Sequence, residues 1–237
     1  MKMNAYAIFS RLAALLAGAF ALISCAGKPG PAEIAGHRFI DLGLPSGLLW
    51  AETNVGASSE TGSGDYFAWG ETAPKADYVW ETYAYGNGED SLTKYTRAGG
   101  PYALELSDDA AAVNWGEGCR MPTLAEFAEL RDTLNCTWTW TARPDSDGTS
   151  VNGYLVTSRA NGNSIFLPAA GCRDGSESLY EGSRGYYWSR SLNPLYDFYA
   201  DYLCLESDFP YIGHDDRSFG LPVRPVAERQ TASARLP

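Results

Sequence analysis

The stretch Pro122-Thr-Leu-Ala-Glu-Phe-Ala-Glu-Leu-Arg-Asp-Thr-Leu-Asn135 contains the clearest local signal in the sequence. Thr123 and Glu126 have the spacing of a capping box, in which two side chains satisfy backbone donors at the start of a helix. Apolar residues at helical spacing follow, and these are Leu124, Phe127, Leu130 and Leu134. The pattern predicts an amphipathic helix that begins after Thr123 and ends near Asn135.

On the C-terminal side of this helix the chain is predicted to form strands. Asn161-Gly162 between two apolar runs is the strongest short signal for a β-hairpin. The predicted strands are Val151–Arg159, Ser164–Leu167, Tyr186–Ser189, Phe198–Leu205 and Phe219–Val226. Pro222 and Pro225 have no backbone N–H, so the last strand is expected at a sheet edge or with interrupted pairing.

The N-terminal side has fewer regular elements. His37–Leu42 and Leu48–Ala51 are predicted strands, and Asp65–Trp69 is either a short aromatic strand or an ordered loop. Residues 70–106 form a long loop that is expected to pack through its own rings. Those rings are Tyr78, Trp80, Tyr83, Tyr85 and Tyr95. A brief helix is expected at Ser107–Val113. Two helices, short antiparallel strands and long ordered loops define an α+β fold.

The composition of the 237 residues excludes several classes of protein. The chain is 45% hydrophobic and 20% charged, so it can bury a sizeable core and is not generally disordered. Its formal net charge is −11, and such an acidic chain repels phosphate backbones, so nucleic acid is not an expected partner. With two histidines and no C-x2-C pair, no zinc site is expected, and no cofactor motif is present.

The N-terminus has the features of an export signal. Basic residues precede a short apolar run, Leu12–Ile23, which is too short for a membrane span of about 20 residues. The end of this run, Leu22-Ile-Ser-Cys25, resembles the lipobox of bacterial lipoproteins, in which the peptide is cut before a cysteine that is then acylated. We therefore expect a lipoprotein anchored through Cys25 in the cell envelope, at the outer membrane or cell surface. The alternative is an ordinary secretory signal with an incidental cysteine.

These signals divide the chain into four parts. Residues 1–24 are the predicted signal peptide, and residues 25–36, rich in Gly, Pro and Ala, are a predicted tether. Residues 37–226 are the predicted domain, and residues 227–237 a predicted tail.

Four cysteines lie within the predicted domain: Cys119, Cys136, Cys172 and Cys204. Export permits disulfides, and four cysteines allow three pairings. Buried free thiols are the favoured alternative, because a core of this size does not need cross-links.

Several phrases of the sequence recur together in a known family. They include Asp41-Leu-Gly-Leu-Pro-Ser-Gly47, Gly64-Asp-Tyr-Phe-Ala-Trp-Gly-Glu-Thr72, Arg120-Met-Pro-Thr123, Ile165-Phe-Leu-Pro-Ala-Ala-Gly171, Gly185-Tyr-Tyr-Trp-Ser189 and Val223-Arg-Pro-Val226. In this order they resemble the Fibrobacter succinogenes major paralogous domain family of surface lipoproteins. The resemblance implies a C-type-lectin-like fold of the formylglycine-generating-enzyme branch, with paired first and last strands and long recognition loops. Cys119 departs from the bulky residue expected there.

The segment 192–219 is the predicted ligand-binding region. Some proteins on this fold are variable proteins of diversity-generating retroelements, which rewrite codons just before a fixed closing motif, and this segment lies there. It mixes aromatic rings with small polar groups, the composition of antibody paratopes. The predicted binding residues are Leu192, Tyr196, Asp197, Phe198, Tyr199, Asp201, Tyr202, Phe209, Tyr211, His214, Asp215, Asp216 and Phe219. We expect a monomer that binds a protein or glycan; a structural or adhesive subunit without a private ligand is the alternative.

Catalysis and metal binding are not expected. Cys172 and Cys204 match no catalytic cysteine motif, so the formylglycine-generating activity is not transferred to this chain. Acidic clusters such as Asp145-Ser-Asp147-Gly148 lack the spacing of an EF-hand, so solvated surface acids are favoured over a Ca²⁺ site. Trp138 and Trp140 share one strand face, where core packing is favoured over a sugar platform.

Overall fold

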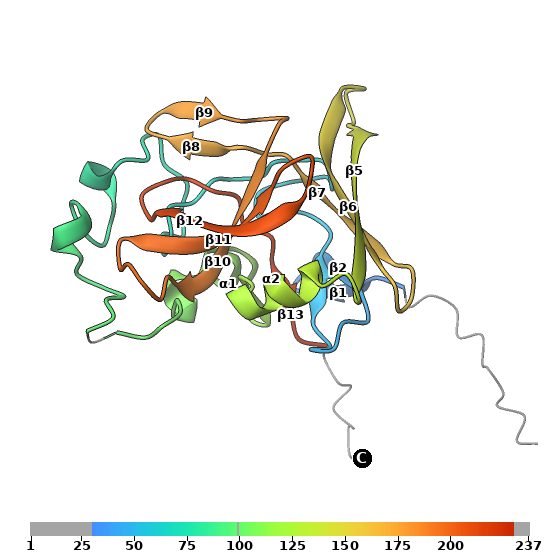
Figure 1. Cartoon of the computed structure of the whole chain (residues 1–237), viewed down its shortest axis with the longest axis horizontal. Helices are drawn as coiled ribbons and strands as arrows, with labels where there is room; N and C mark the ends of the chain where they lie inside the picture. Colours follow the sequence, from blue (N-terminus) through green and yellow to red (C-terminus); the bar gives the residue numbers. More distant parts are fainter. Residues whose placement is uncertain (1–29, 99, 230–237) are drawn as a thin grey trace, which may run out of the picture.

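Antiparallel sheets make up most of the regular secondary structure in the computed structural model of Figure 1, which describes residues 30–98 and 100–229. Within these residues there are two α-helices, so the chain has the predicted α+β, mostly β, architecture. The predicted signal peptide and Cys25 lie outside the described residues. No helix of the described part has the length and apolar character needed to cross a membrane.

A five-stranded sheet joins the two ends of the described chain. Its strands are β1 (Ala32–Ile34), β2 (His37–Asp41), β3 (Leu49–Ala51), β13 (Val226–Ala227) and β4 (Cys119–Arg120), in that order. β1 lies in the predicted tether and Ala227 in the predicted tail, so the ordered sheet extends beyond both predicted limits of the domain. β13 pairs with β3 and β4 rather than with β2, so the expected direct pairing of first and last strands is wrong.

The predicted closing strand Phe219–Val226 is reduced to its last residue. Isolated bridges link Gly220 to Arg173 and Leu221 to Phe67, and regular pairing starts only at Val226. The prolines at 222 and 225 account for this, because neither donates to a ladder.

The predicted hairpin is confirmed and belongs to a three-stranded sheet. β6 (Ser150–Ser158) pairs with β7 (Ser164–Pro168), and β5 (Cys136–Pro144) pairs with the other side of β6. Trp138 and Trp140 of β5 are partly buried against the second hydrophobic core, as favoured from the sequence. A small hairpin of β8 (Cys172–Asp174) and β9 (Glu177–Leu179) follows.

Both predicted helices are present. α2 (Leu124–Arg131) begins at Thr123, and the capping box with Glu126 is complete. Phe127 and Leu130 are buried, but the helix ends at Arg131 and Leu134 is 82% exposed, so the predicted extension to Asn135 is wrong. α1 (Ala110–Trp115) begins at Asp109, whose side chain accepts hydrogen bonds from two backbone amides of the first turn.

The long segment 70–106 packs through its own rings, as predicted. It contains the short 3-10 turns η1 (Trp80–Thr82) and η2 (Glu89–Ser91), and η3 (Leu106–Asp108) follows it. Tyr78 and Tyr83 are buried, and their hydroxyls donate to the carbonyls of Tyr66 and Trp69. These bonds hold the loop without regular secondary structure.

The central sheet consists of β10 (Gly185–Leu192), β11 (Tyr199–Leu205) and β12 (Pro210–Asp216) and separates two hydrophobic cores. Figure 1 shows the β8–β9 hairpin on one side of this sheet and α2 on the other. Trp188, Tyr202 and Cys204 belong to the first core, with Cys172 of β8. Their neighbours Tyr187, Leu203 and Leu205 belong to the second core, with Phe127 and Leu130 of α2. Both faces of the central sheet are therefore apolar over most of its length.

The domain cysteines are free and buried: Cys119, Cys136, Cys172 and Cys204. This is the alternative favoured from the sequence. Cys119 is 3% exposed within the first core, so the small residue at this unusual position is fully packed.

Candidate functional site

The predicted binding residues do not form one outward face. Tyr196, Phe198, Tyr199 and His214 make one group, which we call the outer aromatic cluster. Its ring centroids lie 4.3 Å apart for Phe198 and Tyr199, and 5.0 Å apart for Tyr199 and His214. Asp197 borders this cluster and accepts a hydrogen bond from Arg97 Nε at 2.7 Å. This group is the part of the prediction that the structure brings together at the surface.

Three of the predicted binding residues are interior residues. Leu192, Asp201 and Tyr202 are 5%, 4% and 7% exposed. Asp201 accepts a hydrogen bond from Asn193 Nδ2 at 2.7 Å, and burial raises the pKa of its carboxyl. The expectation of a single exposed array is therefore wrong, because β11 is covered on both faces.

The remaining predicted residues divide between two hollows and a loop contact. Phe209 is 57% exposed and lines a groove beside β5. Asp216 accepts a hydrogen bond from Trp80 Nε1 at 3.3 Å. Tyr211, Asp215 and Phe219 converge with Tyr202 on the other hollow, a cavity of about 300 Å³. We call this cavity the tyrosine pocket.

The tyrosine pocket lies between the central sheet and the β8–β9 hairpin. Its lining residues are Cys172, Asp174, Leu179, Tyr180, Arg184, Tyr186, Tyr202, Tyr211, Asp215, Phe219 and Leu221. Tyr202 pairs with Gly213, which is two residues from Asp215 on β12, so Tyr202 and Asp215 share one face of the β11–β12 ladder. The ladder thus places phenol rings and a carboxylate on the face that the hairpin covers.

The rings of the pocket are in edge contact with one another. Tyr186 and Tyr202 have centroids 5.4 Å apart and planes at 78°, and Tyr202 contacts Trp188 in the same manner at 5.8 Å. Gly213 lies opposite Tyr202, and a Cβ there would come within 2.7 Å of the Tyr202 ring. The absence of a side chain at Gly213 therefore makes room for the Tyr202 ring.

The hydroxyl of Tyr202 has no hydrogen-bond partner among the described residues, although the residue is 7% exposed. The unpartnered side-chain atoms that are fully shielded from solvent in the described residues are Trp50 Nε1, Arg190 Nε and Arg217 Nε. The Tyr202 hydroxyl is not among them, so it keeps some exposure and opens onto the cavity that Tyr202 lines. Buried hydroxyls in proteins are nearly always hydrogen-bonded. A hydroxyl of this kind on a cavity wall is a donor and acceptor available to a ligand.

The arginine of the pocket has an ion-pair partner, whereas its two aspartates have none among the described residues. Arg184 lies over the Tyr180 ring at 4.9 Å and forms an ion pair with Glu206 at 3.2 Å. Asp174 and Asp215 form no ion pair within the described chain. Burial raises the pKa of Asp215, and the amide N–H of Asp216 is its one hydrogen-bond donor there. The pocket therefore offers two carboxylates to a ligand.

Burial keeps Cys172, Tyr186 and Tyr202 of the pocket protonated at neutral pH. Burial raises the pKa of Cys172 to about 12 and that of Tyr186 to about 12, and it raises the pKa of Tyr202 further. A thiol is a weak nucleophile until it ionises, so Cys172 is poorly suited to covalent chemistry. The arrangement is instead suited to hydrogen bonding and to contact with ring faces.

Sequence reasoning missed the charged and aromatic pocket residues outside 192–219, which are Asp174, Tyr180, Arg184 and Tyr186. Tyr186 lies in a predicted strand, and the alternation of Tyr186 and Trp188 against Tyr187 is the signal that separates the two faces. Nothing local marks the β8–β9 hairpin as the wall of a cavity, because only tertiary contact brings it there.

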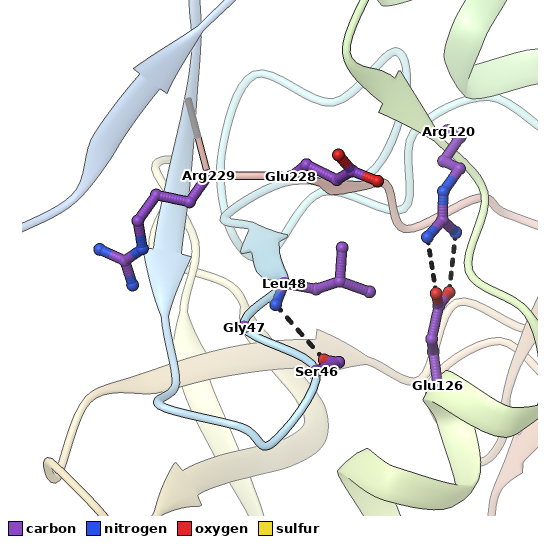
Figure 2. Close-up of a pocket in the computed structure, with 7 residues that line it drawn as sticks. All are labelled: Ser46, Gly47, Leu48, Arg120, Glu126, Glu228 and Arg229. Atoms are coloured by element: carbon purple, nitrogen blue, oxygen red, sulfur yellow. Dashed lines mark hydrogen bonds and ion pairs between the residues drawn. The ribbon is translucent and has the colours of Figure 1, made fainter. Parts of the chain in front are cut away.

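A third hollow lies beside the C-terminal end of the described chain, and Figure 2 shows its lining residues. Three of its four charged lining residues form ion pairs within the described chain. Arg120 donates to both carboxylate oxygens of Glu126, at 2.6 and 2.8 Å, and Arg229 pairs with Asp41. Glu228 is the one charged lining residue without an ion pair among the described residues, so the hollow offers a ligand fewer free polar groups than the tyrosine pocket and is a weaker candidate.

Comparison of the chain with protein-family models, with curated proteins and with solved structures finds no match.

Replacing Asp215 by Asn is expected to stabilise the protein at neutral pH. The folded-state pKa of Asp215 is raised, so the ionised carboxyl costs stability once the pH exceeds its unfolded-state pKa. Asn keeps the acceptor for the Asp216 amide without the charge. Urea unfolding should show a gain on the order of 1 kcal/mol at pH 7 that disappears near pH 3, where both states are protonated. Equal stability of Asp215→Asn and wild type at both pH values would contradict this.

Proposed function

We propose that the protein is a lipid-anchored cell-envelope protein with a C-type-lectin-like domain that binds a saccharide in the tyrosine pocket. The observation that carries the proposal is the buried Tyr202 hydroxyl, which faces the pocket without a partner in the described chain. Phenol rings contact the faces of sugar rings, and the nearby carboxylates accept hydrogen bonds from sugar hydroxyls.

The size of the site favours a saccharide over a protein ligand. Pockets for small molecules have volumes of about 300–1,000 Å³, and this cavity is at the lower end of that range. A protein partner needs roughly 800 Å² of contiguous surface on each side, whereas the predicted binding residues are divided among different faces.

The proposal also explains why the segment 192–219 combines buried and exposed rings. Tyr202, Tyr211, Asp215 and Phe219 of the pocket come from this segment, while Tyr180 and Tyr186 come from outside it. Retroelement-driven variation of 192–219 would change one half of the pocket and preserve the other. Sequencing the gene across a population tests whether variation is confined to this segment.

The decisive variant is Tyr202→Phe, which removes the hydroxyl and keeps the ring. Since the hydroxyl has no partner in the described chain, we expect unchanged stability. Saccharides identified on a glycan array should bind the variant about tenfold more weakly by calorimetry, the loss of one hydrogen bond.

Tyr199→Phe is the matched control, because Tyr199 lies on the opposite face of β11 in the outer aromatic cluster. It should bind within a factor of two of wild type. An array without a bound glycan, or equal affinities for Tyr202→Phe and wild type, would favour a structural or adhesive subunit instead.

A further inference from the structure

A groove separate from the tyrosine pocket lies between β5, the end of α2 and the β11–β12 connection. Its volume is about 490 Å³, and its walls include Trp138, Tyr154 and the exposed ring of Phe209. Trp138 and Tyr154 have ring centroids 5.4 Å apart at 71°. The Tyr154 hydroxyl donates to the Glu206 carbonyl at 2.8 Å, which fixes the connection that carries Phe209. The groove is thus a recess with three aromatic side chains in its walls.

Two arginines in this groove lack a carboxylate partner. Five of the described arginines form no ion pair, whereas the other described arginines and the lysines do. Two of the five, Arg217 and Arg224, are fully buried, and the other three are Arg131, Arg159 and Arg173. Arg131 and Arg159 both line the groove. In a chain with 29 acidic and 18 basic residues, unpaired cations that meet in one recess are unexpected from composition alone.

The two guanidinium groups are held by main-chain carbonyls. Arg131 donates through Nε and Nη2 to the Pro210 carbonyl, at 3.1 and 2.9 Å. Arg159 donates through Nε to the Thr133 carbonyl at 2.7 Å. These bonds use one edge of each group, and the remaining N–H donors have no partner in the described chain. A guanidinium fixed in this way is suited to bidentate binding of a carboxylate.

We propose that this groove binds an organic carboxylate that carries a six-membered ring. Arg159 and Arg131 would bind the carboxylate, and Trp138 and Phe209 would contact the ring. Asp208 also lines the groove, forms no ion pair with either arginine, and is an acceptor for a hydroxyl of the ligand. An acidic sugar and an aromatic acid share this chemistry. The site is independent of the tyrosine pocket.

The test compares charged and neutral probes on the full-length protein. Glucuronate is compared with glucose, and phenylacetate with phenylacetamide, by calorimetry and by the NMR shift of the Trp138 indole N–H. At least one carboxylate should bind tenfold or more tightly than its neutral counterpart, and the preference should shrink as salt is raised. Preference within the sugar pair identifies an acidic saccharide, and preference within the other pair an aromatic acid.

Arg159→Gln should abolish this preference. Arg143→Gln is the matched control, since Arg143 lies on β5 outside the groove and pairs with Glu60. Tyr202→Phe should leave carboxylate binding unchanged, which separates this site from the proposed saccharide pocket. Absence of a charged preference in both pairs, or equal effects of Arg159→Gln and Arg143→Gln, would overturn the proposal.

Discussion

Replacing Arg224 by Met is expected to cost about 3–5 kcal/mol of unfolding free energy. Arg224 is fully buried and has no carboxylate partner; burial lowers the pKa of its guanidinium. Its Nε donates to Asn54 Oδ1 at 2.8 Å, and Nη2 donates to the Phe166 carbonyl at 3.0 Å. Nη1 donates to the Ala51 and Glu52 carbonyls.

The cost arises because the buried oxygen acceptors of Arg224 lose their hydrogen-bond donors. Its contacts join the end of β3 to β7, which belong to different sheets. Met fills much of the volume but donates to none of the acceptors, and each buried acceptor without a donor costs roughly 1–3 kcal/mol. Burying a cation itself costs free energy of desolvation, and Met does not have this cost, so part of the destabilisation is offset.

Urea unfolding of Arg224→Met measures the effect, with Arg38→Met as the control. Arg38 forms an ion pair with Glu52 in which its side chain is 54% exposed, so its removal should cost about 0–1 kcal/mol. Similar losses for the two variants would show that the Arg224 hydrogen bonds do not hold the two sheets together.

The role of Arg224 illustrates what the sequence does not reveal. The phrase Val223-Arg-Pro-Val226 was part of the family resemblance, but a charged residue beside a proline has no local feature that predicts full burial. By contrast, the capping box at Thr123 and the Asn161-Gly162 turn use contacts between near neighbours, so both elements were predictable. Hydrogen bonds and turns between near neighbours are encoded locally, whereas the hydrogen bonds by which Arg224 joins two sheets are not.

The candidate site was predictable only in part for a related reason. Alternation of polar and apolar residues reveals the exposed face of a strand, but β11 is apolar on both faces because a core covers each of them. Tyr202 was therefore assigned outward although it is buried. β12 was not predicted because Pro210, Gly213 and its acidic end disfavour a strand, and such residues are tolerated at the edge of a sheet.

Replacing Gly171 by Ala is expected to displace the β8–β9 hairpin from the central sheet. Gly171 has φ +66°, and a Cβ there would collide with the Leu179 carbonyl oxygen and come within 2.8 Å of the Glu181 nitrogen. Both are main-chain atoms, so relief requires the hairpin to move. We expect a loss of about 2–3 kcal/mol in unfolding free energy. Saccharide affinity in the tyrosine pocket should fall at least tenfold, because Asp174 and Leu179 line it.

Gly175→Ala is the control for the backbone conformation, because it places a Cβ on a residue of positive φ without the steric collision expected at Gly171. Gly175 lies in the same hairpin with φ +56°, but the atoms nearest to an added Cβ are Asp77 Oδ1 at 3.5 Å and Val79 Cγ1 at 3.9 Å. Only the left-handed conformation is then penalised, by about 1 kcal/mol. Hydrogen exchange should show faster exchange of residues 172–179 in Gly171→Ala than in Gly175→Ala. Equal losses of stability and affinity in the two variants would contradict the prediction. They would show that the close approach of Leu179 and Glu181 to Gly171 does not position the hairpin wall of the pocket.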